Sequence, residues 1–493
     1  MELKTKFIGL TTGIPVILLT QKNADKLGIT VGGRAEVKKT SQKDKGLSVI
    51  VDISNNLATS KEVGVSKETK NRLNLKKGQI LDVNLAEPPN SLILIKKKLN
   101  KKELSEKDLD EIIEDVVDNS LSGPEIALFI SAMYSRGMTL KETVYLIKSI
   151  LESGNELKFR NKFVVDKHCI GGIPGNRTTP IVVSICAAAG LLMPKNSSRA
   201  ITSAAGTADV IETIAKIEFT LSEIKKIVKR TNACMVWGGA LGIVPADSKI
   251  IKIEKSLKLD PEAQLLASIM SKKLASDSNF ILIDIPYGRT AKVDRKKALH
   301  LKRKFERLGK YFHKKMKVVL TRANEPIGNG IGPELELRDV INVLKQIENY
   351  PQDLEQKSIF LAGNLLEMVG KVSVGEGMSM AKNILSSGEA YKKFKQIIEA
   401  QKGKIRGIKL AKHKKSFIVK RKRKIKSFDN QKINALARIA GCPSYKSAGL
   451  YIYKHVGETL DKGDKILTIY SESKTRLKHA IDYYKKAKPI KFK

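Results

Sequence analysis

Residues 166–179, DKHCIGGIPGNRTT, bring charge, glycine and hydroxyl groups together in a short space. An apolar, strand-like run ends at Asp166, and the glycines after it let backbone N–H groups approach a bound ion. Lys167 and Arg177 supply positive charge, and two threonines begin a helix whose N-terminus attracts anions. The glycine spacing fits neither a Walker A loop nor a dinucleotide fingerprint. The segment predicts an oxyanion site, and the alternative is a structural strand-to-helix turn.

A second cluster, residues 197–209 (SSRAITSAAGTAD), packs hydroxyl groups, an arginine and a glycine into one short stretch. Hydroxyl groups at this density are costly to bury without hydrogen-bond partners. The alternative is a solvated turn with a helix cap at Thr207 or Asp209. Because one helix separates the two clusters, an α/β arrangement would bring both to the carboxyl edge of one sheet, where ligands bind. Two anion sites that face each other are therefore expected.

The elements that must position these clusters belong to a chain of several domains. With 493 residues, 42% of them hydrophobic, two to four domains with substantial cores are expected. Short apolar runs between turn signals predict a β-rich domain over residues 1–88. Within it, the likeness of LGITVGGRAEV to LNLKKGQILDV points to an internal duplication. Buried strands between helices predict an α/β layer after residue 160, and residues 410–493 return to β character.

A helical segment is predicted between the β-rich and α/β parts, because apolar residues recur at three- and four-residue steps from Ile95 onward. The first helix has a candidate N-cap near Ser105. A second helix is predicted from Pro124 to about Ser135, and a third follows Thr139.

The net charge of +40 indicates attraction to polyanions, either nucleic acid or phosphorylated metabolites. Lysine is scattered through nearly every segment, however, which is typical of a proteome-wide residue bias rather than of a binding patch. Residues 402–426 alternate basic and apolar side chains, which predicts a pair of strands with a solvated basic face. Only Phe417 and Phe428 offer aromatic rings for stacking on bases in this region. Nucleic acid is therefore not an expected partner.

No part of the sequence predicts a membrane segment or a metal site. The longest apolar run, residues 181–193, is shorter than the about 20 residues that span a bilayer, and it predicts a buried helix. The four cysteines lie far apart with no C-x-x-C pair, so neither a zinc site nor a disulfide is expected. We expect a soluble, cytoplasmic protein.

Four motifs, in order along the chain, resemble the thymidine phosphorylase family: DKHCIGG, SSRAITSAAGTAD, WGGALGIVPAD and QLLASIMSKKLA. The longer N-terminal domain, with SRAITS and PGNRTT, resembles the AMP phosphorylase branch of that family. The resemblance implies a multidomain α/β fold, in which a helical domain faces a mixed α/β sheet domain across a cleft that closes on substrate. A β-rich N-terminal domain and a β-rich α+β C-terminal domain complete it. The implied domains are residues 1–88, residues 95–157 completed by about 246–276, residues 160–245 with 277–400, and residues 410–493.

The resemblance also implies an activity and the residues that perform it. Inorganic phosphate, the co-substrate, would split a nucleoside 5′-monophosphate such as AMP, and CMP and UMP are further candidates. The products would be the free base and ribose 1,5-bisphosphate. No metal or organic cofactor is implied, and the chain would form a homo-oligomer, a dimer or larger. Phosphate would bind at Lys167, His168, Gly171 and Ser197. The nucleotide would bind at Gly172, Ser198, Arg199, Ala200, Ile201, Thr202, Ser203, Thr207, Ser268 and Lys292, and Asp260 would donate a proton.

Two of these residues have alternative structural roles. Asp260 can act as a general acid only if its surroundings favour the protonated carboxyl, and Leu257, Leu259 and Pro261 could supply that desolvation. Alternatively, Asp260 caps the helix that begins just after it. His168 either orients the substrate or serves the strand end structurally.

Two departures from the family pattern bear on the substrate. Pyrimidine-specific members carry a base-recognising arginine where this chain has Ile253, and its loss removes a bidentate donor for a pyrimidine carbonyl. Many members have a phosphate-binding serine where this chain has Cys169. Two alternative functions stay open. One is a thymidine or pyrimidine-nucleoside phosphorylase that acts on unphosphorylated nucleosides, and the weaker one is a basic RNA-binding protein on an inactive enzyme fold.

Overall fold

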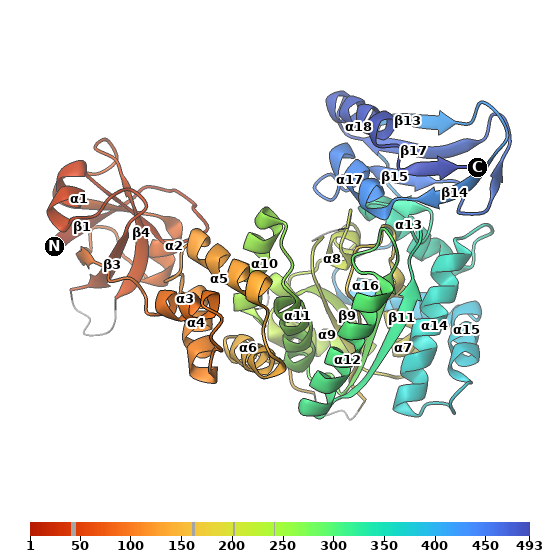
Figure 1. Cartoon of the computed structure of the whole chain (residues 1–493), viewed down its shortest axis with the longest axis horizontal. Coiled ribbons are helices and arrows are strands. Elements are labelled where there is room, and N and C mark those ends of the chain that lie inside the picture. The colour runs from red at the N-terminus through yellow and green to blue at the C-terminus, as the bar shows by residue number, and fades with distance from the viewer. Residues whose placement is uncertain (41–45, 160–162, 201–202, 241) are drawn as a thin grey trace. The chain divides into compact units, whose positions relative to one another are not determined.

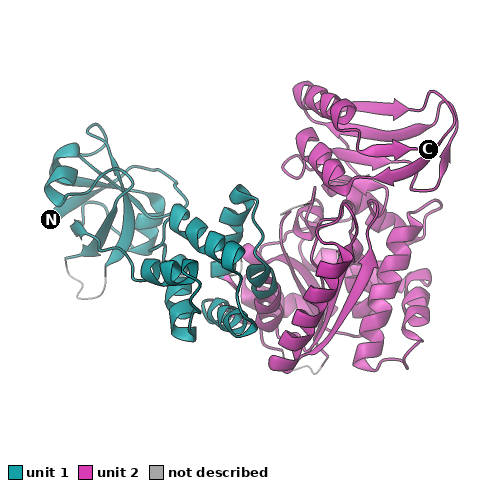
Figure 2. Ribbon diagram, viewed as in Figure 1, with its two compact units in different colours: residues 1–153, 245–267 teal, residues 154–244, 268–493 magenta. Residues whose placement is uncertain are grey.

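The computed structural model describes residues 1–40, 46–159, 163–200, 203–240 and 242–493. The chain forms two compact units (Figure 2). The first comprises Met1–Ser153 and Pro245–Ala267, and the second comprises Gly154–Val244 and Ser268–Lys493. None of the described helices is long and apolar enough to cross a membrane.

The first unit begins with a closed six-stranded barrel in the strand order β1-β5-β2-β4-β3-β6 (Figure 1). Its inward-facing residues are mainly valine, leucine, isoleucine and alanine. The strands are β1 Glu2–Phe7, β2 Val16–Leu19, β3 Arg34–Lys39, β4 Leu47–Ile53, β5 Glu62–Val65 and β6 Ile80–Leu85, and the helices are α1 Gln21–Leu27 and α2 Lys67–Arg72.

The barrel confirms the internal duplication, because each half runs strand, strand, helix, strand. The parallel pairing of β1 with β5 has its counterpart in the parallel pairing of β4 with β2. The antiparallel pairing of β1 with β6 likewise has its counterpart in that of β4 with β3. In both halves a hydroxyl N-cap starts the helix, Thr20 for α1 and Ser66 for α2.

The rest of the first unit is helical, and its helix starts follow from capping boxes. Ser105, Ser122 and Thr139 each precede a helix with an acidic residue three positions later. Helix α10 returns from a distant part of the sequence and packs on α4 and α5. The helices are α3 Ser91–Leu99, α4 Glu106–Asp118, α5 Gly123–Arg136, α6 Leu140–Glu152 and α10 Pro245–Leu257, and α11 Glu262–Ala275 continues into the second unit.

The second unit contains a parallel sheet in two ladders, β11-β10-β7 and β8-β9. A parallel bridge between Val164 and Leu192 joins them, so all the carboxyl ends point the same way. The strands are β7 Val165–Cys169, β8 Met193–Ser197, β9 Ala233–Trp237, β10 Phe280–Tyr287 and β11 Lys315–Arg322. The helices around them are α7 Thr178–Ala188, α8 Thr207–Ile211, α9 Leu221–Thr231, α12 Arg295–Tyr311, α13 Pro333–Lys345, α14 Gln352–Val369, α15 Gly377–Ser386 and α16 Glu389–Ala400.

Helix α7 is the buried helix that the apolar run of residues 181–193 predicts. The helix ends at Ala188, before the end of the run, and Met193 at the end of the run begins strand β8. Its residues from Thr178 to Ala187 are all buried, because the sheet and helices α14 and α16 enclose it. The helix therefore holds the first glycine loop against the core.

The C-terminal part of the second unit combines short strands with two helices. The predicted strand pair within residues 402–426 is wrong: β13 pairs with β17, and β14 pairs with β16 and β18. The alternating pattern identified strands but carried no information about their partners. The elements are β12 Gly330–Ile331, β13 His413–Ile418, β14 Arg423–Phe428, α17 Asn430–Ala440, β15 Gly449–Ile452, β16 Thr459–Leu460, β17 Lys465–Ser471, α18 Lys474–Ala487 and β18 Ile490–Phe492.

Candidate active site

The carboxyl edge of the parallel sheet carries both predicted clusters. The loop of residues 170–177 follows β7, and the loop of residues 198–206 follows β8. Because β7 and β8 are parallel neighbours, both loops leave the sheet at the same edge, as the sequence predicts. This is the place where ligands bind in sheets of this kind.

The end of β7 contains buried charges. Lys167 is almost fully buried, and its ammonium group donates hydrogen bonds to the hydroxyls of Thr178 (2.7 Å) and Thr179 (3.4 Å). Burial penalises the ammonium form and lowers the pKa of Lys167 to about 8. Among the described residues, no carboxylate forms an ion pair with this lysine. Lys167 is therefore placed to gain from a bound anion.

Two buried aspartates hold other lysines within the same sheet, Asp166 near the start of β7 and Asp284 in the middle of β10. Asp166 binds Lys195 at 2.9 Å and Lys273 at 2.6 Å. Asp284 on β10 lies level with Cys169 of β7 and binds Lys357 at 2.9 Å. Burial alone would raise the pKa of both carboxyls, but the attraction of these lysines outweighs it, and both pKa values are lowered.

Lysines outnumber carboxylates along these strands, because the buried Lys167, Lys195 and Lys273 and the partly buried Lys357 accompany two aspartates. Desolvation, and then the repulsion of Lys273 and Lys195, holds the pKa of His168 well below its usual value. The imidazole is therefore neutral near pH 7 and adds no charge. Buried unpaired charge is costly, so an anion at this edge would be stabilised by the surplus.

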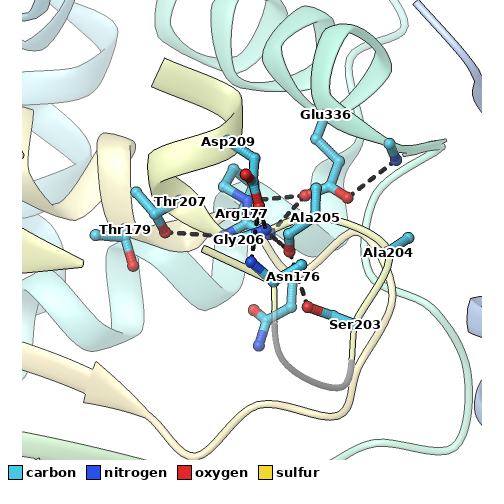
Figure 3. Close-up of polar contacts among 12 residues, drawn as sticks. Asn176, Arg177, Thr179, Ser203, Ala204, Ala205, Gly206, Thr207, Asp209 and Glu336 are labelled. Carbon is cyan, nitrogen blue, oxygen red and sulfur yellow. Dashed lines mark hydrogen bonds and ion pairs between the residues drawn. The ribbon is translucent and has the colours of Figure 1, made fainter. Parts of the chain in front are cut away.

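Arg177 connects the two loops rather than facing a ligand (Figure 3). Its guanidinium donates to the carboxylate of Glu336 (2.8 Å), the hydroxyl of Thr207 (2.8 Å) and the carbonyl of Ala205 (2.7 Å). The expectation that Arg177 supplies charge to the phosphate site is therefore wrong, because Glu336 on α13 neutralises it. The same contacts show that Thr207, a predicted ligand, holds the loop in place.

Arg199 is also engaged by carboxylates. It donates to both oxygens of Glu212, at 2.6 and 2.7 Å, and to Asp209 at 3.3 Å, and its guanidinium lies over the ring of Trp237 at 4.6 Å. These hydrogen bonds, the one to Glu212 first, raise the pKa of Arg199. Glu212 also pairs with Lys446 at 2.6 Å. To bind a phosphate, Arg199 would have to share its donors with Glu212.

The rest of the second loop closes on Asp209. One carboxylate oxygen accepts from the backbone N–H groups of Ala200 (2.7 Å) and Gly206 (2.8 Å). The hydroxyl of Ser203 donates to the carbonyl of Ala205 at 2.8 Å, and Ser198 is half-buried. Ile201 and Thr202 lie outside the described residues. The loop thus has a scaffold of its own hydrogen bonds.

Asn434 of helix α17 joins both loops, although 262 residues separate it from Gly172. Its amide oxygen accepts from the N–H of Ala204 (3.0 Å), and its amide nitrogen donates to the carbonyl of Gly172 (3.2 Å). Arg438, one turn later, donates to the carbonyl of Ser203 at 3.1 Å. Asn434 is not among the residues predicted from the sequence, and its only signal there is a polar residue on the buried face of an amphipathic helix.

Other predicted ligands lie in or beside the two loops, and Ser268 lies on helix α11. Gly171 and Gly172 have φ values of 87° and 90°, a region that favours glycine. A Cβ on Gly172 would come within 2.9 Å of the Cβ of Lys292, so the Lys292 segment lies against this loop. Ser197, at the end of β8, is buried, and its hydroxyl has no partner among the described residues. The hydroxyl of Ser268 on α11 accepts from Lys272 at 2.8 Å.

Asp260 belongs to the first unit and lies just before helix α11. Its side chain is exposed, and the nearby Leu257 is itself 38% exposed. The expected desolvation by its neighbours is therefore wrong for this structure.

Comparisons with known proteins match the chain to nucleoside and nucleotide phosphorylases over nearly its whole length. Family models match the helical bundle domain of a glycosyl transferase family over residues 93–154, its α/β domain over residues 161–391, and the pyrimidine nucleoside phosphorylase C-terminal domain over residues 424–491. The AMP phosphorylase of Thermococcus kodakarensis is 39% identical over 100% of this chain and 98% of its own length. A putative thymidine phosphorylase of Legionella pneumophila (strain Corby) is 39% identical over 97% of this chain and 93% of its own length.

The chain belongs to the thymidine phosphorylase family. Membership makes the protein a pentosyltransferase and confirms the resemblance that the motifs carry. The AMP phosphorylase of Methanocaldococcus jannaschii, 41% identical over 91% of this chain and 90% of its own length, supports nucleoside phosphorylase activity.

A solved structure supports the family fold independently of sequence. The anthranilate phosphoribosyltransferase of Thermus thermophilus superposes with a TM-score of 0.53 at 18% identity, over 63% of this chain and 99% of that chain. At this identity the likeness concerns the fold alone. It agrees with the helical and α/β parts that the family models match.

Three lysines of the site were not singled out by sequence: the buried Lys195 and Lys273, and the partly buried Lys357. The signal for them was indirect. Asp284 lies in an otherwise apolar strand and Asp166 follows a short apolar run, and a buried carboxylate requires a cationic partner. Which lysine supplies it depends on the tertiary fold.

Proposed function

We propose that the protein phosphorolyses nucleoside 5′-monophosphates, AMP foremost, to free base and ribose 1,5-bisphosphate. The observation that carries the proposal is the buried Lys167, which bonds the hydroxyl at the start of α7 and has no carboxylate ion pair among the described residues, beside a second loop rich in hydroxyl groups. Likeness over nearly the full chain to archaeal AMP phosphorylases supports the choice of substrate. The reaction uses inorganic phosphate as co-substrate and needs no metal or organic cofactor.

The attacking phosphate is assigned to the first loop. Lys167, at hydrogen-bond distance from the Thr178 hydroxyl, supplies an ammonium group whose charge has no carboxylate ion pair among the described residues. Ser197 offers a buried hydroxyl, and Gly171 lets the backbone approach the ion. Phosphorolysis passes through an oxocarbenium-like sugar, by analogy with glycoside cleavage. Holding the phosphate against C1′ replaces a bimolecular encounter.

The nucleotide is assigned to the second loop, with Ser198 to Ser203 and Thr207 as its contacts, and to Ser268 and Lys292. Arg199 takes part by sharing its guanidinium between Glu212, Asp209 and the 5′-phosphate, since its five donors exceed its three hydrogen bonds to these carboxylates. The neutral His168 orients the substrate without adding charge.

Asp260 is proposed as the general acid that protonates the departing base. Its side chain is exposed, so a bound base can reach it. Without a proton donor the base would leave as an anion, which raises the barrier.

A thymidine or pyrimidine-nucleoside phosphorylase is the second candidate, because putative thymidine phosphorylases of Legionella pneumophila are equally similar. One assay separates the two: AMP, CMP, UMP, thymidine and uridine are compared at equal concentration with phosphate, and the release of each base is measured. We expect AMP to give the highest kcat/KM. A preference for thymidine over every monophosphate would overturn the proposal.

A further inference from the structure

A cavity away from the sheet edge lies within the second unit, between α13, α16 and residues 404–408. Its volume is about 620 Å³, within the range of small-molecule sites. Part of its lining is apolar, from Ile341, Tyr391, Ile405 and Ile408. None of its lining residues belongs to the loops assigned to the substrate.

Basic residues dominate the charged part of this lining. Arg338, Lys345, Lys395, Lys404 and Arg406 line the cavity with one carboxylate, Glu399. Arg406 is neutralised by Glu334 at 2.5 Å, and Lys395 lies 3.8 Å from Glu399. Arg338, Lys345 and Lys404 have no carboxylate partner among the described residues. The cavity is therefore positively charged.

Arg338 supplies the second observation. Its Nη2 atom is buried and has no hydrogen-bond partner in the described part of the chain. The guanidinium lies over the ring of Tyr451 at 4.0 Å, which fixes its plane. Arg338 is itself only half-buried and lines the cavity, and a guanidinium whose plane is fixed is suited to an anion that accepts from its accessible donors.

We propose that this cavity binds a phosphorylated small molecule, at a second anion site separate from the substrate site. Arg338 and Lys404 bind the phosphate, and Ile405 and Tyr391 contact the uncharged part of the ligand. Helix α13 also carries Glu336, the partner of Arg177. The cavity and the loop of residues 198–206 therefore share a supporting helix.

Calorimetric titration of the full chain with inorganic pyrophosphate tests this site without turnover, so its result is independent of the proposed function. We expect Arg338→Gln/Lys404→Ala to lose one pyrophosphate per chain, or to bind it at least about tenfold more weakly, a loss of about 1.4 kcal/mol. The matched control Lys225→Ala/Lys382→Ala removes two exposed lysines from α9 and α15 and should bind within about twofold of the unmodified chain.

Arg338→Lys is the conservative variant, which keeps the charge but loses the planar fork, and we expect intermediate weakening. Lys404→Ala alone changes an exposed side chain and should weaken binding without affecting thermal unfolding. Unchanged pyrophosphate binding in the double variant would overturn the inference, and so would an equal loss in the control. Titration with citrate separates phosphate from carboxylate: equally tight citrate binding that depends on Arg338 would contradict a phosphorylated ligand.

Discussion

Replacing Asn434 by alanine should slow catalysis by disordering both substrate loops at once. The side chain is buried, and its two hydrogen bonds connect the N–H of Ala204 to the carbonyl of Gly172. Neither bond is part of a helix or strand, and both partners lie in loops assigned to the ligands. The variant therefore acts on the position of the loops and not on the chemistry itself.

The magnitude follows from the two bonds. Each neutral hydrogen bond contributes roughly 0.5–1.5 kcal/mol, and a buried N–H left without a partner costs about 1–3 kcal/mol. The N–H of Ala204 belongs to a fully buried residue, so the larger figure applies to it. If about 1.4–2.7 kcal/mol appears as lost transition-state stabilisation, kcat/KM falls by roughly 10–100-fold.

Steady-state kinetics with AMP and phosphate measures the effect, and Gln431→Ala on the exposed face of the same helix is the matched control. Asn434→Asp keeps the acceptor for Ala204 but loses the donor to Gly172, so it should raise the KM for phosphate most. The reasoning is refuted if Asn434→Ala stays within about twofold of Gln431→Ala in kcat/KM.

Four further outcomes are expected. The KM for phosphate should rise up to about tenfold per pH unit above about pH 8, since Lys167 loses its proton there, and Lys167→Arg should flatten that rise. A KM for phosphate that does not change with pH in the unmodified chain would contradict the assignment of Lys167 to the phosphate site. Arg177→Met should lower the free energy of unfolding in urea by about 3–5 kcal/mol, because Glu336 is left buried and unpaired; a loss under about 1 kcal/mol argues against the buried pair. Arg199→Ala should lower kcat/KM for AMP by roughly 10–100-fold and change that for adenosine much less; equal losses would show that Arg199 only supports the loop. Asp260→Asn should lower kcat by about 10²–10⁴-fold without changing thermal unfolding; activity within about threefold of the unmodified chain excludes Asp260 as the acid.

Local chemistry predicted the elements that position the site. Ser105 and Thr139 mark helix starts because a hydroxyl N-cap satisfies backbone donors that the helix leaves free. The two clusters meet at one edge because parallel neighbouring strands share a direction. The capping rule involves residues close in sequence, and the second rule involves only the direction of a strand. Both can be inferred from the order of residue types along the chain.

Pairing between distant segments could not be predicted in the same way. Basic alternation in residues 402–426 identified β13 and β14, but their partners come from much later in the chain. The partner of Arg177 on α13, 159 residues away, depends on how a helix packs across the sheet. A sequence motif that resembles a charged ligand site can therefore serve the scaffold instead.

Phosphate-dependent release of adenine from AMP is the most direct test of the central claim. The protein is incubated with AMP in phosphate-free buffer and with added phosphate, and adenine and ribose 1,5-bisphosphate are quantified together. The proposed function predicts that both products form in equal amounts only when phosphate is present. Release of adenine at the same rate without phosphate, or no release at all, would contradict it.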